Sequence, residues 1–103
     1  MIKAGETTSF ELTNALITRI SEIDSTINAY ISVDAESALT QAKLVDCKIA
    51  RKEILSPLAG VPIALKDVIC VRGGRTTCAS GILQNYVPPY DAEVVSRLRH
   101  SDA

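Results

Sequence analysis

The sequence predicts an α/β fold in which helices make up most of the chain and one or two strands make up the rest. Three segments carry apolar residues at helical spacing, and one short segment is apolar at nearly every position. Apolar residues three and four positions apart share one face of a helix. A short continuous apolar run is typical of a strand that is buried on both faces and covered by helices. The combination therefore favours α/β over a small helical domain with one odd extended segment.

The first helix is expected at residues 8–24. Thr8 and Glu11 fit the pattern Thr-x-x-Glu of a capping box, in which each side chain binds the backbone N–H of the other residue. An apolar stripe follows at steps of four, four, three and four residues. Its members are Leu12, Leu16, Ile20, Ile23 and Ile27.

Two further helices are expected at residues 35–52 and 91–101. Asp34 stands just before the first of them and Asp91 stands at the start of the second, and aspartate is a preferred N-cap residue. Each segment has an apolar stripe at helical spacing. The stripes consist of Ala35, Ala38, Ala42, Val45 and Ile49 in the first, and Val94, Val95 and Leu98 in the second.

A strand is expected at about residues 63–69, in a segment rich in Ile and Val, and residues 28–34 are a short β-like segment. Lys66 interrupts the apolar run and is followed by Asp67. Three interpretations of this lysine remain open. Its amine reaches water at the strand end, or it is buried and paired with Asp67, or it is catalytic in a partly dry site. Successive strand residues point to opposite faces, which disfavours the simple pair with Asp67.

The catalytic interpretation makes a definite chemical demand. Ligands of open α/β sheets bind near the carboxyl ends of strands, where Lys66 would lie. A free lysine has a pKa of about 10.4, and burial lowers that pKa by disfavouring the charged form. A shift of roughly three pKa units corresponds to about 4 kcal/mol. A neutral lysine could then take a proton from a serine hydroxyl.

Residues 72–81 form a glycine-rich connection, Arg-Gly-Gly-Arg-Thr-Thr-Cys-Ala-Ser-Gly. This segment lacks the full P-loop pattern, so a phosphate cradle is disfavoured. Its threonines are expected to satisfy local polar groups, as in turns. We expect residues of this loop, together with the neighbour of Lys66, to shape a pocket beside the lysine. These residues are Asp67, Thr76, Thr77, Cys78, Ala79 and Ser80.

Composition excludes several classes of function. The net charge of −1 gives no overall field that would attract nucleic acid or an anionic membrane. The longest apolar run has eight residues, against roughly 20 for a membrane helix, and the N-terminus lacks the apolar core of a secretory signal. Cys47, Cys70 and Cys78 form neither a disulfide framework nor a zinc pattern. We expect them to be reduced, mostly packed thiols in a cytoplasmic protein that binds no metal.

Three stretches carry a resemblance to a known family. They are Pro-Leu-Ala-Gly-Val-Pro-Ile-Ala-Leu-Lys-Asp, Gly-Gly-Arg-Thr-Thr-Cys-Ala-Ser-Gly-Ile-Leu and Val-Pro-Pro-Tyr-Asp-Ala-Glu-Val-Val. Together they resemble the amidase-signature family. Gly-Glu-Thr-Thr-Ser-Phe-Glu-Leu and the segment 27–43 also fit the opening of a family member, so the resemblance covers nearly the whole chain, from about Gly5 to Ala103. Thr-Thr-Cys-Ala-Ser with Pro-Pro-Tyr-Asp-Ala is similar to its tRNA-linked branch, the A subunits of glutamyl-tRNA(Gln)/aspartyl-tRNA(Asn) amidotransferases. The resemblance implies that residues 1–103 are the N-terminal part of a single amidase domain with a mixed-sheet α/β fold.

The resemblance also implies a chemistry. The family uses a Ser–cis-Ser–Lys triad, whose lysine corresponds to Lys66. The lysine deprotonates the middle serine, which relays the proton change to the nucleophilic serine. That serine attacks the amide of glutamine, and the released ammonia is used to convert Glu-tRNA(Gln) or Asp-tRNA(Asn) to Gln-tRNA(Gln) or Asn-tRNA(Asn). Implied partners are the amidotransferase's B subunit, which uses ATP and Mg, its C subunit, and charged tRNA through the complex. No cofactor is expected to bind this chain itself.

Departures from the family pattern leave alternatives open. Both serines of the triad lie downstream of residue 103 in the family, and this chain has no Gly-Gly-Ser-Ser stretch, so we expect it to be inactive alone. Gly81 replaces a position that is often basic, and His100-Ser101-Asp102 stands where an Ala-Gly turn is common. The alternatives are a general amidase acting on small amides, and a non-catalytic fragment that binds another chain or oligomerises through exposed strand edges and apolar helix faces.

Overall fold

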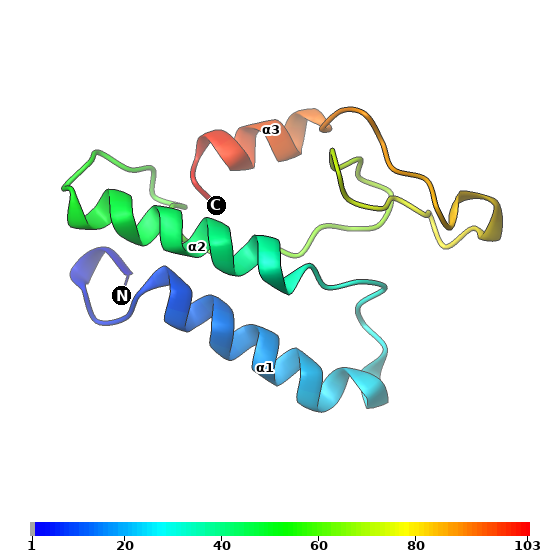
Figure 1. The fold of residues 1–103 in the computed structure, drawn as a ribbon, viewed down its shortest axis with the longest axis horizontal. Coiled ribbons are helices and arrows are strands. Elements are labelled where there is room, and N and C mark those ends of the chain that lie inside the picture. The colour runs from blue at the N-terminus through cyan, green and yellow to red at the C-terminus, as the bar shows by residue number, and fades with distance from the viewer. Residues whose placement is uncertain (1) are drawn as a thin grey trace. The chain divides into compact units, whose positions relative to one another are not determined.

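The computed structural model describes residues 2–103, except for the side chain of Lys3, and divides into two compact units. The first unit extends to Pro62 and includes Asp102–Ala103, and the second unit is Ile63–Ser101. Figure 1 shows the helices in chain order. The elements are η1 (Ile2–Ala4), α1 (Ser9–Ile27), α2 (Ala35–Ala50), η2 (Gly81–Leu83) and α3 (Glu93–His100).

Helix α1 begins with the capping box that the sequence predicts. The Thr8 hydroxyl accepts from the Glu11 N–H at 3.0 Å, and the Glu11 carboxylate accepts from the Thr8 N–H at 2.9 Å. These bonds from Thr8, the backbone one first, lower the pKa of Glu11. The helix ends at Ile27, beyond the expected residue 24, because Asn28 adopts the left-handed conformation that closes helices (φ 55°).

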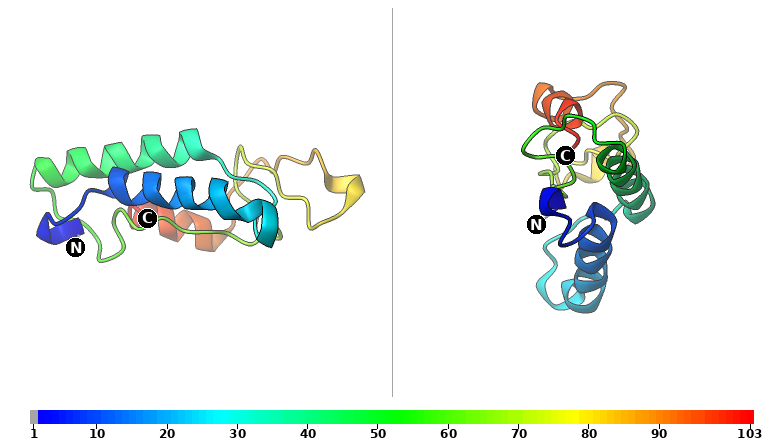
Figure 2. Two further views of the ribbon diagram at one scale, coloured as in Figure 1. Left: turned by 90° about the horizontal axis from the view of Figure 1, so that it is seen from below. Right: turned by 90° about the vertical axis from the view of Figure 1, so that its left-hand side faces the viewer.

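Helix α2 packs antiparallel to α1 in the first unit (Figures 1 and 2). Asp34 caps it as predicted, since its carboxylate accepts from the Ser37 N–H at 3.1 Å. The centre of the predicted stripe is the part that is buried, with Ala42 4% and Val45 1% exposed. The helix ends at Ala50, two residues before the expected end.

A carboxylate from α2 caps the N-terminus of α1. The two oxygens of Asp46 accept from the N–H groups of Ser9 and Phe10, at 2.8 and 3.0 Å. These N–H groups have no partner within their own helix, so the contact satisfies them and places a negative charge at the positive end of the helix. It joins residues 37 positions apart, which explains why local sequence patterns did not predict it.

Gly60 and Asp102 meet next to this junction. The Ser9 hydroxyl donates to the Gly60 carbonyl at 2.9 Å, and the Gly60 N–H donates to the Asp102 carbonyl at 2.7 Å. Asp102 has a left-handed backbone (φ 57°), and its carboxylate lies 2.6 Å from the Lys48 amine. The side-chain bond to Asp102 raises the pKa of Lys48. A glycine at position 102 would adopt this left-handed backbone at lower cost than aspartate. The ion pair with Lys48 offsets that cost for Asp102.

This exchange predicts an order of stability among variants of Asp102. Asp102→Ala loses the ion pair and retains the left-handed strain, whereas Asp102→Gly loses the ion pair but also relieves the strain. We expect the alanine variant to unfold more easily than the glycine variant by about 1 kcal/mol, measured as thermal or urea unfolding. Equal stability of the two variants would contradict this assignment of strain.

The expected strand at 63–69 does not form among residues 2–103. Residues 63–66 have no regular secondary structure, residues 67–68 are in a turn, and the Ile69 N–H donates to the Lys66 carbonyl at 2.9 Å. The second β-like segment, 28–34, is also unpaired. A strand is stabilised by a neighbouring strand, and the described segments supply none. The apolar side chains of Ile63, Leu65 and Val68 are consequently exposed.

Helix α3 belongs to the second unit and is shorter than the expected 91–101. Its N-cap is Ala92, so the prediction that Asp91 caps it was wrong. The Asp91 carboxylate instead accepts from the Arg72 N–H at 2.7 Å and lies 3.5 Å from the Arg99 guanidinium. Two distant donors draw this side chain away from the first turn of the helix. Val95, which is 3% exposed, is the buried apolar residue of α3.

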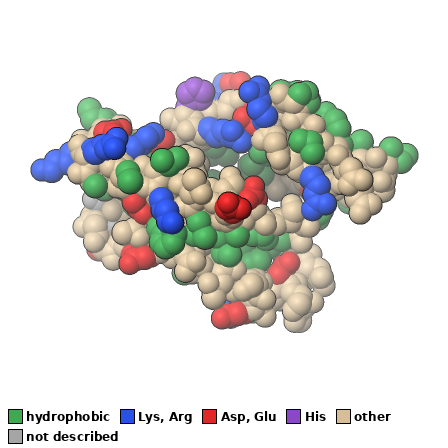
Figure 3. Space-filling model, viewed as in Figure 1, with side chains coloured by type: hydrophobic (Ala, Val, Ile, Leu, Met, Phe, Trp, Pro, Cys, Tyr) green, Lys and Arg blue, Asp and Glu red, His purple; other side chains and the backbone are tan. Residues whose placement is uncertain are grey.

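The surface is mixed in charge. On the face shown in Figure 3, acidic and basic side chains are interspersed with hydrophobic ones, as a net charge of −1 leads one to expect. Within residues 2–103, the helices are all too short or too polar to cross a membrane.

Candidate active site

Lys66 lies in the second unit, which begins at Ile63, and its side chain is exposed. It is the last residue of the irregular segment 61–66. Within the described part of the chain its amine has no hydrogen bond or ion pair. The interpretation of Lys66 as a buried partner of Asp67 is therefore wrong, because Asp67 bonds elsewhere. The side chains of Ile63, Leu65 and Val68, which were expected to be buried in a strand, are exposed, so this chain does not by itself form the partly dry site.

The Asp67 carboxylate is the best-connected polar group around Lys66. One oxygen accepts from the Thr77 N–H at 2.8 Å, and the other accepts from the Thr77 hydroxyl and from the Ala79 N–H at 3.1 Å. The Asp67 carbonyl also accepts from the Cys78 N–H at 3.2 Å. Residue 67 is thus bonded to three consecutive residues of one turn.

These bonds favour the charged form of Asp67. The Thr77 hydroxyl and then the Thr77 N–H lower the pKa of the carboxyl from its ordinary value of 3.8. A carboxyl whose pKa is lowered on folding stabilises the folded state fully above the ordinary value. That stabilisation is lost as the pH falls through the lowered value. At neutral pH the carboxylate is therefore a permanent hydrogen-bond acceptor.

The turn that Asp67 binds has an unusual backbone. Cys78 and Ala79 both have left-handed conformations, with φ of 51° and 53°. Residues with a Cβ adopt this conformation at a cost of roughly 1–2 kcal/mol each. The bond from the Ser80 N–H to the Thr77 carbonyl at 2.8 Å closes the turn. The bonds from Asp67 offset a conformation that the sequence does not favour locally.

Thr76 and Thr77 satisfy local polar groups, as predicted. Both are buried, at 3% and 8% exposed. The Thr76 N–H donates to the Tyr86 carbonyl at 3.1 Å, and its hydroxyl donates to the Ile69 carbonyl at 3.3 Å. The structure therefore brings Asp67 together with Thr76, Thr77, Cys78 and Ala79. That these residues and Ser80 shape a pocket for a substrate remains a prediction.

The prediction of packed cysteines was wrong for Cys47 and Cys78, which are exposed. The backbone of Cys78 contributes to the turn around Asp67, and this leaves its side chain outside. Cys70 is half-buried, and its thiol donates to the Tyr90 hydroxyl at 3.6 Å. That bond raises the pKa of Tyr90. The described residues contain no cluster of His, Cys, Asp and Glu side chains that could hold a metal ion.

Sequence reasoning missed the second aspartate that organises this unit. Asp91 binds the Arg72 N–H, and the adjacent Ala92 N–H donates to the Cys70 carbonyl at 2.8 Å. Segment 70–72 is thereby joined to the start of α3.

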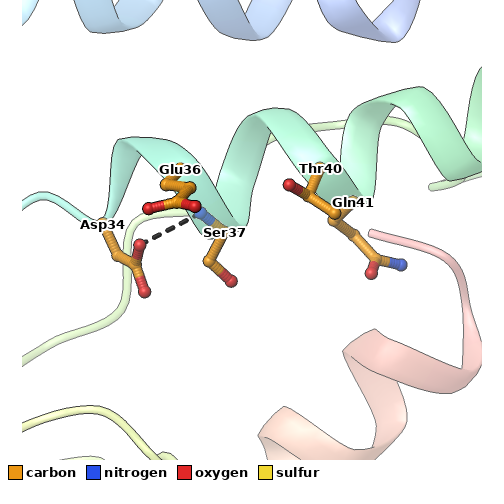
Figure 4. Close-up of a pocket in the computed structure, with 5 residues that line it drawn as sticks. All are labelled: Asp34, Glu36, Ser37, Thr40 and Gln41. Carbon is orange, nitrogen blue, oxygen red and sulfur yellow. Dashed lines mark hydrogen bonds between the residues drawn. The ribbon is translucent and has the colours of Figure 1, made fainter.

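An open polar depression in the first unit is unrelated to Lys66. It lies along the first turns of α2, as Figure 4 shows. The Asp34 carboxylate on its rim is already bonded to the Ser37 N–H. Its lining is Asp34, Glu36, Ser37, Thr40 and Gln41. A single helix N-terminus with its own cap makes no further site.

A family model described as Amidase matches residues 11–103. The chain belongs to the amidase family. Relatives named as the A subunit of glutamyl-tRNA(Gln) amidotransferase are 50% identical to this amidase chain over 96–100% of its length. They come from Acidothermus cellulolyticus, Geobacter sp. (strain M21) and Moorella thermoacetica. The amidase chain spans about a fifth of their length, 20–21%.

Solved structures show the same fold. One is described as an inhibitor-bound vestigial protein complex that reveals the evolutionary origins of an s-triazine catabolic enzyme. It has a TM-score of 0.93 and 32% identity, over 99% of the amidase chain and 22% of its own chain. A second structure of that complex has a TM-score of 0.92 at the same identity. The segment that carries Lys66 thus has its counterpart in much longer proteins.

Proposed function

We propose that this amidase chain is the N-terminal part of the A subunit of a tRNA-dependent amidotransferase. The observation that carries the proposal is the 50% identity, across essentially all of the chain, to several proteins of that name. The loop Thr-Thr-Cys-Ala-Ser and the segment Pro-Pro-Tyr-Asp-Ala also favour the tRNA-linked branch. Residues 1–103 belong, in this proposal, to a single domain whose sheet is completed by the rest of the full-length protein.

Lys66 supplies the general base of the proposed reaction. It takes a proton from a serine hydroxyl, and this serine in turn deprotonates the nucleophilic serine. The nucleophile forms a bond to the amide carbon of glutamine, the C–N bond breaks, and the nitrogen leaves as ammonia after it is protonated. Water then hydrolyses the acyl-enzyme to glutamate. The exposed position of Lys66 in this chain leaves its amine available to groups contributed by the remaining four fifths of the full-length protein.

The proposed partners divide the work. Ammonia passes to the B subunit, which activates tRNA-bound glutamate or aspartate with ATP and Mg, and the C subunit packs against the A subunit. No cofactor binds to the residues of this chain. The activity is cytoplasmic, where charged tRNA is present. The 103 residues alone, which have no Gly-Gly-Ser-Ser stretch, release no ammonia from glutamine.

A general amidase is the second candidate. It is favoured by the structural match with a TM-score of 0.93. The description of that structure refers to an s-triazine catabolic enzyme and mentions no tRNA. The same lysine chemistry would then act on a small amide. The two candidates differ in what stimulates the reaction, and a single assay separates them.

The full-length protein, of the length of its named relatives, should hydrolyse glutamine faster when ATP, charged tRNA and the B and C subunits are present. We expect a stimulation of about tenfold or more, because closure of the complex aligns the reacting groups. The measurement is ammonia release with and without charged tRNA, and uncharged tRNA is the control. A rate that is high on small amides and indifferent to charged tRNA would select the general amidase.

A further inference from the structure

Asp67 follows the proposed base, Lys66, in the sequence, and its carboxylate makes all of its hydrogen bonds to one turn. Each of its three side-chain hydrogen bonds comes from Thr77 or Ala79. We propose that Asp67 is a positioning residue for Lys66, holding the backbone from which the lysine projects by binding the turn at residues 77–79. The inference rests on the proposed function, because it concerns the geometry of that lysine.

The contacts join the segment of Lys66 to the turn at several points. The Lys66 carbonyl accepts from the Ile69 N–H at 2.9 Å, and the Ile69 carbonyl accepts from the Thr76 hydroxyl at 3.3 Å. Asp67 adds its side-chain bonds and the bond from the Cys78 N–H to its carbonyl. Segments 66–69 and 76–79 therefore form one cross-linked loop pair. Thr76 and Thr77 are buried within it, and Lys66 is exposed at its edge.

The chemistry of Asp67 suits positioning rather than proton transfer. A carboxylate has about four acceptor sites, and three of them are occupied by N–H and O–H donors of the turn. Those donors stabilise the charged form, so the lowered pKa makes protonation at working pH unfavourable. The carboxylate therefore neither accepts nor delivers a proton in the reaction. It acts through the geometry of its neighbour.

Asparagine is the sharpest replacement because it keeps the shape and changes the donors. Both oxygens of Asp67 face donors, so either orientation of an amide would place its NH₂ against an N–H or a hydroxyl of the turn. Thr77→Val and Thr77→Ser form a second pair. Valine keeps the volume without the hydroxyl that binds Asp67, while serine restores that hydroxyl.

The experiment measures kcat, KM and the pH profile of amide hydrolysis in the full-length protein. We expect Asp67→Asn and Thr77→Val to lower kcat roughly 10- to 100-fold, because a displacement of about 1 Å costs up to a hundredfold. KM should change less than about twofold, and the pH profile of kcat should keep its shape. Thr77→Ser should retain most of the wild-type kcat. Ala79→Gly, which eases a left-handed residue, should restore part of the kcat lost in Asp67→Asn.

The outcomes separate this inference from the function on which it rests. Full activity in Lys66→Ala would overturn the proposed function. An inactive Lys66→Ala alongside a wild-type kcat in Asp67→Asn would overturn only the positioning role. Loss of a limb from the pH profile of kcat in Asp67→Asn would assign proton transfer to Asp67 and also overturn the positioning role. If Asp67→Asn does not fold, the comparison of Thr77→Val with Thr77→Ser tests the inference instead. Equal kcat values in these two variants would refute it.

Discussion

Replacing Lys66 by alanine in the full-length protein is expected to lower glutamine hydrolysis by about 10³-fold. A positioned general base contributes typically 10²–10⁴ to the rate, and the nucleophilic serine is weak without one. Alanine removes the only group of residue 66 that can accept a proton. The loss should appear in kcat and in kcat/KM alike, because the proton is transferred in the transition state rather than in the bound substrate.

The same substitution should leave the folded state intact. The side chain of Lys66 is exposed, and its amine contacts no partner among residues 2–103. Substitutions of exposed residues without such contacts usually change the free energy of unfolding by less than about 0.5 kcal/mol. The hydrogen bond to the Lys66 carbonyl is made by the backbone and survives the change. Ammonia release and the melting temperature, measured on one preparation, therefore separate loss of chemistry from loss of fold.

Arginine at this position tests the nature of the role. Lys66→Arg keeps a positive charge, but a guanidinium stays protonated in proteins, so arginine cannot act as a base. We expect it to be as inactive as alanine. Lys43→Ala is the matched control, since it removes an exposed lysine whose amine lies 4.9 Å from the Phe10 ring centroid on the first unit. Substantial ammonia release by Lys66→Arg would show that residue 66 acts through its positive charge and would exclude its role as the general base.

Local patterns predicted the helical half of the fold because helices are made by local contacts. The capping box at Thr8 and Glu11 joins residues three apart, and so does the cap at Asp34. The stripe of α2 was also recognisable, with Ala42 and Val45 buried at its centre. By contrast, the strand at 63–69 depends on neighbours that no segment of residues 2–103 provides. An apolar run favours burial, but both burial and strand pairing need other segments, and the side chains of Ile63, Leu65 and Val68 stay exposed without them.

In the candidate site too, features of neighbouring residues were predictable from the sequence, whereas contacts between distant residues were not. The adjacency of Lys66 and Asp67 was visible in the sequence, and so was the polar capacity of Thr76 and Thr77. The wrap of the turn around Asp67 was not, because it requires left-handed backbones at Cys78 and Ala79. Neither cysteine nor alanine predicts a left-handed conformation, which is more typical of glycine and asparagine. The bonds that overcome it span ten to twelve residues of irregular loop.

Replacing Gly60 by alanine is expected to destabilise the first unit by about 2–5 kcal/mol. Gly60 is buried and has φ of +78°, a conformation that costs a residue with a Cβ roughly 1–2 kcal/mol. A Cβ at this position would also lie 3.0 Å from both Cβ and Oγ of Ser9. Overpacking of this kind adds typically 1–3 kcal/mol.

Ser9 cannot move aside easily. It is 1% exposed, its N–H donates to Asp46, and its hydroxyl donates to the Gly60 carbonyl. A shift of either backbone would also strain the bond from the Gly60 N–H to the Asp102 carbonyl. Hydrogen exchange at the Gly60 segment should therefore accelerate about 30-fold or more in Gly60→Ala, since each 1.4 kcal/mol is a factor of ten.

Three variants separate the two contributions. Gly5→Ala has a positive φ of 71° with open space around the added Cβ, so it should show the conformational cost alone. Gly81→Ala has neither feature and should change stability little. Ser9→Gly removes the Cβ that Gly60→Ala would meet, so the two changes combined should cost less than the sum of each alone. Strict additivity of these two changes would show that the close approach of Gly60 and Ser9 carries no energy.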